Sequence, residues 1–258
     1  MTGVSITPFV VLFFVTAFLY AAVGFGGGST YNALLVISGA DYQVIPMIAL
    51  VCNLIVVSGN LVQFHKQKLI PWKFALPIIL VSIPAAFFAG RIVISQSQFI
   101  LALGLSLFIS GLLMMIRENE VHQSSAWLNT KKGIIINLII GFLLGGLAGL
   151  VGIGGGIFFA PLLHLQQSLP TKQIAAFSSV FIFFNSLAGL IGQASKHSQE
   201  TGLDNLLEYT WFFIAVFIGG QIGNRLGVSV ISAIVVRRLT GALVIYVGLR
   251  LLYIFFIN

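Results

Sequence analysis

The sequence predicts an all-α protein that crosses a membrane several times. Of its 258 residues, 58% are hydrophobic and 7% are charged, and the mean hydropathy is +1.06. This composition leaves too little polar surface to cover a soluble globule of this length. The apolar residues form long continuous runs without in-and-out alternation, which favours helices over a β-barrel. Two glycine-rich clusters, 128 residues apart, interrupt the two longest runs.

Eight apolar runs are present, and most have the length of roughly 20 residues that one helix needs to cross a bilayer. We therefore expect a polytopic integral membrane protein with about eight hydrophobic helical segments. The first run is kept as a helix, because residues 1–8 contain no lysine or arginine and the run exceeds the length of a signal peptide. The runs cover residues 6–39, 44–64, 74–92, 98–116, 133–165, 173–193, 209–227 and 239–257.

The order of the motifs indicates two homologous repeats of four segments each. Residues 117–132, RENEVHQSSAWLNTKK, form the longest polar stretch and the expected linker between a first repeat, 1–116, and a second repeat, 133–258. Three landmarks recur in the same order on either side of this linker. They are the glycine clusters at 24–28 and 152–156, then Ala49-x-x-Cys52-Asn53 and Ala175-x-x-Ser178-Ser179, then Arg91 and Arg225 at a following helix end.

The glycine clusters predict a broken or re-entrant helix in each repeat. Residues 6–39 would form a straight helix about 50 Å long, at roughly 1.5 Å per residue, which exceeds a hydrocarbon layer of about 30 Å. Each glycine lowers helix stability by about 1 kcal/mol relative to alanine. Non-helical backbone at membrane depth is tolerated only where protein or water surrounds it, so paired breaks are typical of transporter binding sites. Tight helix crossings without a ligand remain an alternative.

The peptide amides that follow each break predict an anion site. Amides 27–30 and 155–158 would be the first donors of a half-helix, whose N-terminus carries about half a positive charge. Two such ends that face one another can hold an anion, and glycine lets the ligand approach the backbone. The candidate binding residues in the breaks are Gly24, Gly26, Gly27, Gly28, Ser29, Thr30, Gly152, Gly154, Gly155 and Gly156.

The remaining polar residues also favour an anion over a cation. All six acidic residues fall in expected loops or at helix ends, so no carboxylate is expected at membrane depth to bind sodium or relay protons. Among the amides and hydroxyls that remain there, repeated positions single out Asn53, Ser178 and Ser179 as substrate-binding candidates, with interhelical hydrogen bonding as the alternative. Arg91 and Arg225 complete the candidate set, either as residues that attract anions or as arginines that reach the lipid headgroups.

Several classes of protein are not expected from these residues. Paired carboxylates, a histidine cluster and a nucleophile with a base are all lacking at the predicted helix depth, so we expect no enzyme, no catalytic residue, no metal site and no cofactor. The net charge of +7 comes from basic residues scattered over short loops, as in a multi-pass protein of a bacterial inner membrane. The expected partners are the lipid bilayer and a small anionic substrate but not nucleic acid, and assembly into a homo-oligomer stays open.

The positions of lysine and arginine bear on the topology of the repeats. If each broken segment crosses the bilayer once, the repeats are parallel and the basic residues divide eight to five between the two sides. If each segment folds back to the side from which it entered, the repeats are inverted and the division is ten to three. Because cytoplasmic loops carry an excess of lysine and arginine, we expect inverted repeats with both termini outside the cytoplasm.

The combined motifs resemble the TauE/SafE family of sulfite exporters over nearly the whole chain. They are the twin glycine clusters, the Leu-Leu pairs that follow them (Leu34-Leu35 and Leu162-Leu163), the Ala-x-x-small-small helix start, and the Gly-Arg or Gly-Asn-Arg helix end. The resemblance implies an inner-membrane permease that moves sulfite, a sulfonate or a related organosulfur anion, usually outward. Ala33 stands where the family often has proline, and Cys52-Asn53 replace its usual Thr-Ser pair, so the identity of the anion stays open.

Residue chemistry and resemblance together predict a secondary transporter of a small anion. The anion would bind near the bilayer midplane between the two breaks and move by alternating access. A passive anion channel, and a structural or assembly subunit without transport activity, remain the alternatives.

Overall fold

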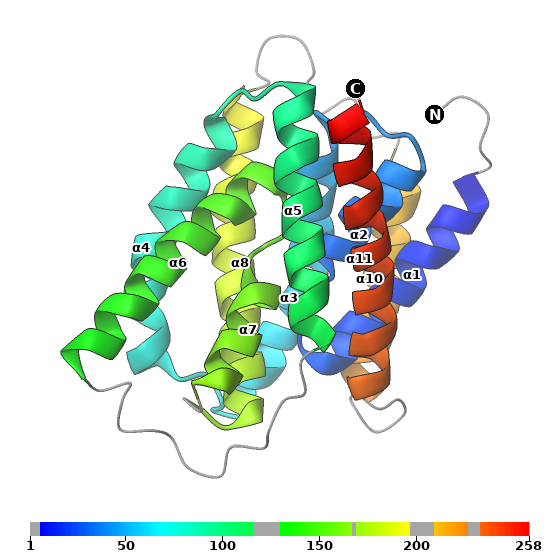
Figure 1. Ribbon diagram of the computed structural model, residues 1–258. Coiled ribbons are helices and arrows are strands. Elements are labelled where there is room, and N and C mark those ends of the chain that lie inside the picture. The colour runs from blue at the N-terminus through cyan, green and yellow to red at the C-terminus, as the bar shows by residue number, and fades with distance from the viewer. Residues whose placement is uncertain (1–5, 116–129, 167–168, 197–208, 227–232, 258) are drawn as a thin grey trace.

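The computed structural model describes residues 6–115, 130–166, 169–196, 209–226 and 233–257, which form ten helices and no strand (Figure 1). The prediction of an all-α protein is confirmed. In the first half of the chain the helices are Ile6–Val23 (α1), Gly28–Ile37 (α2), Ile45–Lys66 (α3), Trp72–Arg91 (α4) and Gln96–Met115 (α5). In the second half they are Lys131–Val151 (α6), Gly156–Leu165 (α7), Thr171–Lys196 (α8), Thr210–Leu226 (α10) and Ala233–Ile257 (α11).

Six helices in the described part of the chain are long and apolar enough to cross a membrane. They are Ile45–Lys66, Trp72–Arg91, Gln96–Met115, Lys131–Val151, Thr171–Lys196 and Arg238–Ile257. Helices α2 and α7 have ten residues each, which at roughly 1.5 Å per residue is about half the thickness of the hydrocarbon layer. The expected linker 117–132 lies mostly outside the described residues, and α6 already includes its last two residues.

The two longest apolar runs are each broken at the glycine cluster. Gly24 and Gly152, just after α1 and α6, have φ angles of 84° and 79°. Gly27 and Gly155, just before α2 and α7, have φ angles of 88° and 75°. A residue with a Cβ costs roughly 1–2 kcal/mol in this left-handed conformation, so glycine at these positions allows the chain to leave one helix and start the next. The predicted breaks are present at equivalent positions of both halves.

Close contacts at glycines of α6 show how this helix is oriented relative to α4. A Cβ on Gly145 would meet the backbone of Ser82, and a Cβ on Gly149 would meet that of Ala86, so the two helices are parallel. The C-terminus of α8 lies beside the C-terminus of α4, because Lys196 Nζ donates to the carbonyl oxygen of Ile92 over 3.5 Å. Helices α4, α6 and α8 therefore run in one direction.

Helices α1, α3 and α10 run in the opposite direction. Gly219 and Gly223 on α10 approach the carbonyl oxygens of Phe14 and Phe18, so α10 is parallel to α1. The end of α10 lies at the end of α3, because Gln63 Nε2 donates to the carbonyl oxygen of Asn224 over 3.0 Å. Helix α1 begins at the end of the bundle where helix α11 finishes (Figure 1).

Each of the two short helices, α2 and α7, is antiparallel to the long helix that precedes it. Helix α2 starts beside the middle of α3 and is followed by the start of α3, so it is antiparallel to α1. Helix α7 starts beside the middle of α8 and is followed by the start of α8, so it is antiparallel to α6. Helices α3 and α8 pack together, α1 packs on α10, α6 packs on α4, and α5 packs on α11.

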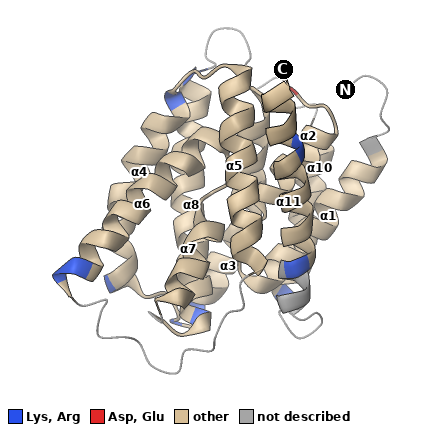
Figure 2. Cartoon of the chain, in the orientation of Figure 1, with Lys and Arg blue, Asp and Glu red and all other residues tan. Residues whose placement is uncertain are grey.

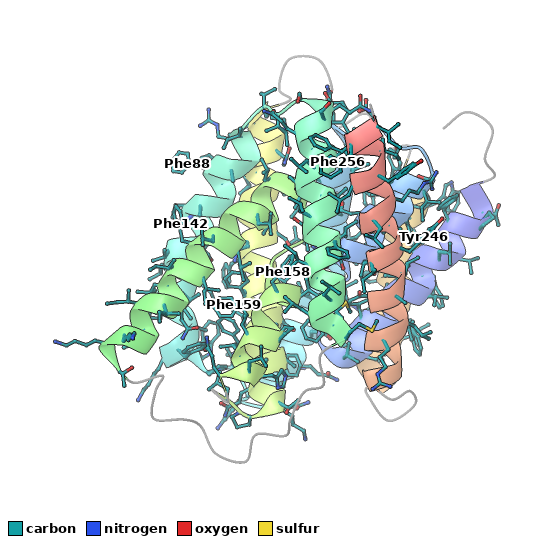
Figure 3. The ribbon with its side chains drawn as sticks, in the orientation of Figure 1. Phe88, Phe142, Phe158, Phe159, Tyr246 and Phe256 are labelled. Atoms are coloured by element: carbon teal, nitrogen blue, oxygen red, sulfur yellow. The ribbon has the colours of Figure 1, made fainter. Side chains whose placement is uncertain are left out.

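The outer surface of the bundle is apolar, as lipid requires. Phe88, Phe142, Tyr246 and Phe256 project outward and are largely exposed, whereas Phe158 and Phe159 near the start of α7 are buried (Figure 3). Lysine and arginine gather toward the two ends of the bundle (Figure 2). Asp41, the acidic residue in the described part of the chain, is exposed in the loop before α3.

The basic residues divide unequally between the two ends. Arg91 and Lys196 lie at the end where α4 and α8 finish, and Arg250 lies in the last turns of α11, which finishes at the same end. The larger group lies at the opposite end. Its described members are Lys66, Lys68, Lys73, Lys131, Lys132, Lys172, Arg225 and Arg238.

Candidate functional site

The two helix breaks meet at Asn53, in the middle of α3. A Cβ placed on Gly28 would lie 2.6 Å from Asn53 Nδ2 and 2.7 Å from the carbonyl oxygen of Ile153 in the other break. A Cβ placed on Gly154 would lie 2.9 Å from Asn53 Nδ2. Since Asn53 is fully buried, the backbones of both breaks approach one carboxamide in the interior of the bundle.

Helix α8 supplies the opposite wall of this meeting point. Ile182 lies 3.1 Å from the Cβ position of Gly26 and 3.0 Å from that of Gly154, and the Oγ of Ser186 lies 3.3 Å from the latter. Sequence reasoning did not single out either of these α8 residues. Ser186 follows Ser179 by seven residues, and this two-turn spacing on one helix face was the available signal.

Each half of the chain holds the break of the other half by a side-chain hydrogen bond. Asn53 Nδ2 donates to the carbonyl oxygen of Gly152 over 3.4 Å, and Ser179 Oγ donates to the carbonyl oxygen of Gly24 over 2.6 Å. The donors are 126 residues apart and the acceptors 128. Each bond therefore runs from one half of the chain to the break in the other, and the two bonds satisfy carbonyl groups that α1 and α6 leave unpaired at their ends.

Part of the predicted set of free amides is paired within the first turn of α2 or α7. Thr30 donates to the carbonyl oxygen of Gly27 over 2.9 Å, and Phe158 donates to that of Gly155 over 3.1 Å. Gly156 donates to Gly154 over 3.0 Å. Across the described residues, no hydrogen bond involves the amides of the following residues: Gly27, Gly28, Ser29, Gly155 and Ile157.

Buried side-chain atoms beside the breaks also have no hydrogen-bond partner among the described residues. They include Ser29 Oγ, Asn53 Oδ1, Ser178 Oγ and Ser186 Oγ, all on fully buried residues. A buried polar group left unpaired costs about 1–3 kcal/mol, so such groups are rare and require an explanation. Thr30 differs, because its Oγ1 lies 2.9 Å from the hydroxyl of Tyr20. A bound solute or water would supply the missing partners.

Arg91 and Arg225 lie away from the breaks, at the C-terminal ends of α4 and α10. Both are exposed, and the guanidinium of Arg91 lies 5.6 Å from the centre of the Phe87 ring. The structure thus brings together Gly26, Gly28, Gly154 and Asn53, while the two arginines occupy opposite ends of the bundle.

An all-helical bundle in which two interrupted apolar segments meet is typical of membrane transporters. The chain belongs to the family described as sulfite exporter TauE/SafE, which it matches over residues 9–251. It is accordingly a multi-pass membrane protein and a transporter rather than an enzyme, with a small-molecule substrate and the lipid bilayer as partners.

Similar proteins carry the same general description. The chain is 32% identical to the probable membrane transporter protein y4hK of Sinorhizobium fredii, over 94% of this chain and 96% of that protein. It is 27% identical to MJ0441 of Methanocaldococcus jannaschii, over 74% and 73% of the two chains, and 23% identical to YunE of Bacillus subtilis, over 96% and 98%. Both are also named probable membrane transporter proteins. No solved structure matches the chain.

Proposed function

We propose that this transporter binds a small oxyanion, namely sulfite, a sulfonate or another organosulfur anion, where the two helix breaks meet, and moves it by alternating access. The observation that carries the proposal is the convergence of Gly28, Ile153 and Gly154 on Asn53. Unpaired amides and the positive ends of α2 and α7 supply the attraction for negative charge. The name of the family, sulfite exporter, supports the choice of organosulfur anions.

The electrostatic environment of the meeting point fits an anion. The described basic side chains lie toward the ends of the helices, and the described acidic residue, Asp41, lies in an exposed loop. Charge on the solute would therefore be balanced by peptide dipoles and by neutral donors such as the hydroxyls of Ser178 and Ser186. Among the described residues no carboxylate, the usual oxygen ligand of a metal cation, lies at this point.

The proposal includes two inverted repeats, residues 1–116 and 133–258, joined by the linker 117–132. The exchange of partners supports it: α1 packs on α10 while α6 packs on α4, and the bonds of Asn53 and Ser179 are exchanged in the same way. A two-fold relation produces such reciprocal contacts, because residue i of one copy meets residue j of the other and the reverse. The opposite directions of α1 and α6 agree with the inversion.

The proposed orientation places the end rich in lysine and arginine in the cytoplasm of a bacterial cell. Eight described basic residues lie at that end, which includes the C-termini of α3 and α10, and three lie at the other. Positive charge in short loops is retained in the cytoplasm. Helices α1 and α11 would then begin and end, respectively, outside the cytoplasm.

Thermal unfolding of the purified protein tests the proposal. A solute that binds only the folded state stabilises it by about 2.7 kcal/mol at a concentration of 100 times Kd. We expect a rise in Tm with at least one member of a panel of sulfite, sulfate, thiosulfate, taurine and sulfoacetate. A flat response to the whole panel would count against an organosulfur anion as the substrate. Uptake into proteoliposomes against a concentration gradient then separates a coupled transporter from a passive channel.

A further inference from the structure

A second set of polar side chains lies along α3 and on the part of α10 that packs against it. Asn60 follows Asn53 by seven residues, so both lie on one face of α3, roughly 10 Å apart along the helix. Val56 and Val57, both buried, separate them. Asn60 is 2% exposed, and its Nδ2 has no partner among the described residues. The Asn60 carboxamide is thus a buried donor without a partner among the described residues, about two helical turns along α3 from the meeting point of the breaks.

Helix α10 faces this part of α3 with two more carboxamides. A Cβ on Gly59 would lie 2.5 Å from Asn224 Nδ2 and 3.6 Å from Gln221 Nε2. Gln63 Nε2 donates to the backbone oxygen of Asn224 over 3.0 Å, while Asn224 Oδ1 has no partner in the described part of the chain. Around Gly59, side chains rather than backbone fill the space between these two helices.

The polar surface continues to the end of the bundle. Gln63, Gln221 and Asn224 are partly exposed, and the next residue, Arg225, is exposed. This is the end where most of the described lysines and arginines lie (Figure 2). Asn60, the neighbour of Gly59 in α3, is therefore a buried carboxamide close along the helix to a polar surface that ends beside a cation.

The corresponding interface of the other half, between α4 and α8, is built differently. Gly90 and Gly189 stand at the positions that correspond to Asn224 and Gln63, at offsets of 134 and 126 residues. A Cβ on Gly90 would lie 2.8 Å from the carbonyl oxygen of Gly189, so the two backbones are in contact. Beyond them, Gln193 is buried and its Nε2 donates to the carbonyl oxygen of Gly149 over 2.8 Å. This interface is closed, and its amide is paired.

From this asymmetry we infer that the α3–α10 interface holds a second binding step for the same class of small oxyanion, between the central site and the cation-rich end. The inference rests on the proposed function. Asn60 Nδ2 donates to the anion, the carboxamides of Gln221 and Asn224 replace part of its hydration, and Arg225 attracts it to that end of the interface. The α4–α8 interface, where two backbones are in contact, offers no such step.

Accessibility of introduced cysteines tests the route without any substrate. Cys52 is the single cysteine of the chain and is buried, so N60C and S186C are compared in a C52A background. Inside-out membrane vesicles and spheroplasts expose the two faces to a membrane-impermeant maleimide. We expect N60C to react in inside-out vesicles only and S186C, at the position that corresponds to Asn60, in neither preparation. No reaction of N60C, reaction from the other face, or equal reaction of S186C overturns the inference.

Transport kinetics test the binding step with sulfite as the probe. Asn60→Leu removes the donor and keeps a side chain of the same branching, and Asn137→Leu is the matched control, because Asn137 is fully buried and bonds within α6 to Gly133 over 3.0 Å. We expect Asn60→Leu to slow sulfite flux at least tenfold with Kd within threefold of wild type, and the control to change neither.

Three outcomes separate the two proposals. Flux of Asn60→Leu at the wild-type rate overturns the inference, and so does a loss of binding as large as that of Asn53→Ala, which would place Asn60 in the central site. Asn60→Ser, a smaller variant that keeps one donor, is expected to retain part of the flux if the leucine variant does not fold. A wild-type protein that neither binds nor moves sulfite, while N60C reacts as expected, counts against sulfite as the substrate and leaves the route supported.

Discussion

Replacement of Gly28 by alanine adds one methyl group where the two helix breaks touch. The new Cβ would lie 2.6 Å from Asn53 Nδ2 and 2.7 Å from the carbonyl oxygen of Ile153, whereas ordinary contact begins near 3.4 Å. The Asn53 side chain and the second break would each have to retreat by about 0.7 Å, and overpacking of this kind costs about 1–3 kcal/mol. Gly28 is the first residue of α2 and does not have a positive φ, so the effect is steric.

We expect Gly28→Ala to reach the membrane and to lose at least tenfold in affinity for the anion that stabilises the wild-type protein, which corresponds to about 1.4 kcal/mol. The assay is the anion-dependent shift in Tm of the purified variant, followed by flux in proteoliposomes. Gly146→Ala is the control. Gly146 is on α6, and its new Cβ would make only an ordinary contact, 3.9 Å from the Cβ of Ala89 on α4. The control is expected to bind normally and to gain up to about 1 kcal/mol of stability. Wild-type binding and flux in Gly28→Ala would refute the reasoning.

Four further predictions follow from the same geometry. Gly27→Leu and Gly155→Leu are each expected to abolish flux without loss from the membrane fraction, because bulk is added at φ angles of 88° and 75°; full activity in both would mean that the clusters only pack helices. Asn53→Ala is expected to weaken anion binding at least tenfold and Asn60→Ala less than threefold, as measured by Tm shifts, and equal small effects would remove Asn53 from the site. Ser179→Ala loses its 2.6 Å bond to the first break and is expected to lower stability by about 1 kcal/mol, which an unchanged Tm would contradict. A reporter fused to the C-terminus is expected to be active outside the cytoplasm, and cytosolic activity would eliminate the proposed orientation.

The sequence was sufficient to locate the helix breaks, because glycine acts on the backbone locally. Four glycines in five positions oppose a helix wherever the segment lies in the fold, and the same cluster recurs 128 residues later. Run length then showed that residues 6–39 are too long for one crossing. Composition alone indicated lipid as the solvent, since 7% charged residues cannot cover a soluble surface.

The partners of the site residues could not be predicted, because they depend on how the halves pack. Repeated positions drew attention to Asn53 and Ser179, but the sequence does not show that each bonds to the break of the other half. Ile182 and Ser186 were missed since nothing in a helical run marks which face meets the breaks. Arg91 also recurs in position, yet a helix end places it at the surface.

The asymmetry between the two interfaces was likewise outside the reach of the sequence. Gln63 and Asn224 correspond to Gly189 and Gly90; glycine serves close packing in membrane helices, and Asn and Gln serve hydrogen bonds between them. Only the approach of the helices shows that the glycine pair brings two backbones into contact, while Asn224 Oδ1 of the polar pair is left without a partner among the described residues.

The claim that both breaks form one shared site is tested most directly by saturable binding of radiolabelled sulfite to purified wild-type protein, Gly28→Ala and Gly154→Ala. The two glycines lie in different halves, and a Cβ on either would press on Asn53. If one anion is held between the breaks, each substitution alone removes all of the tight binding. Loss of half of the sites in each variant, or full binding in both, would contradict a shared site.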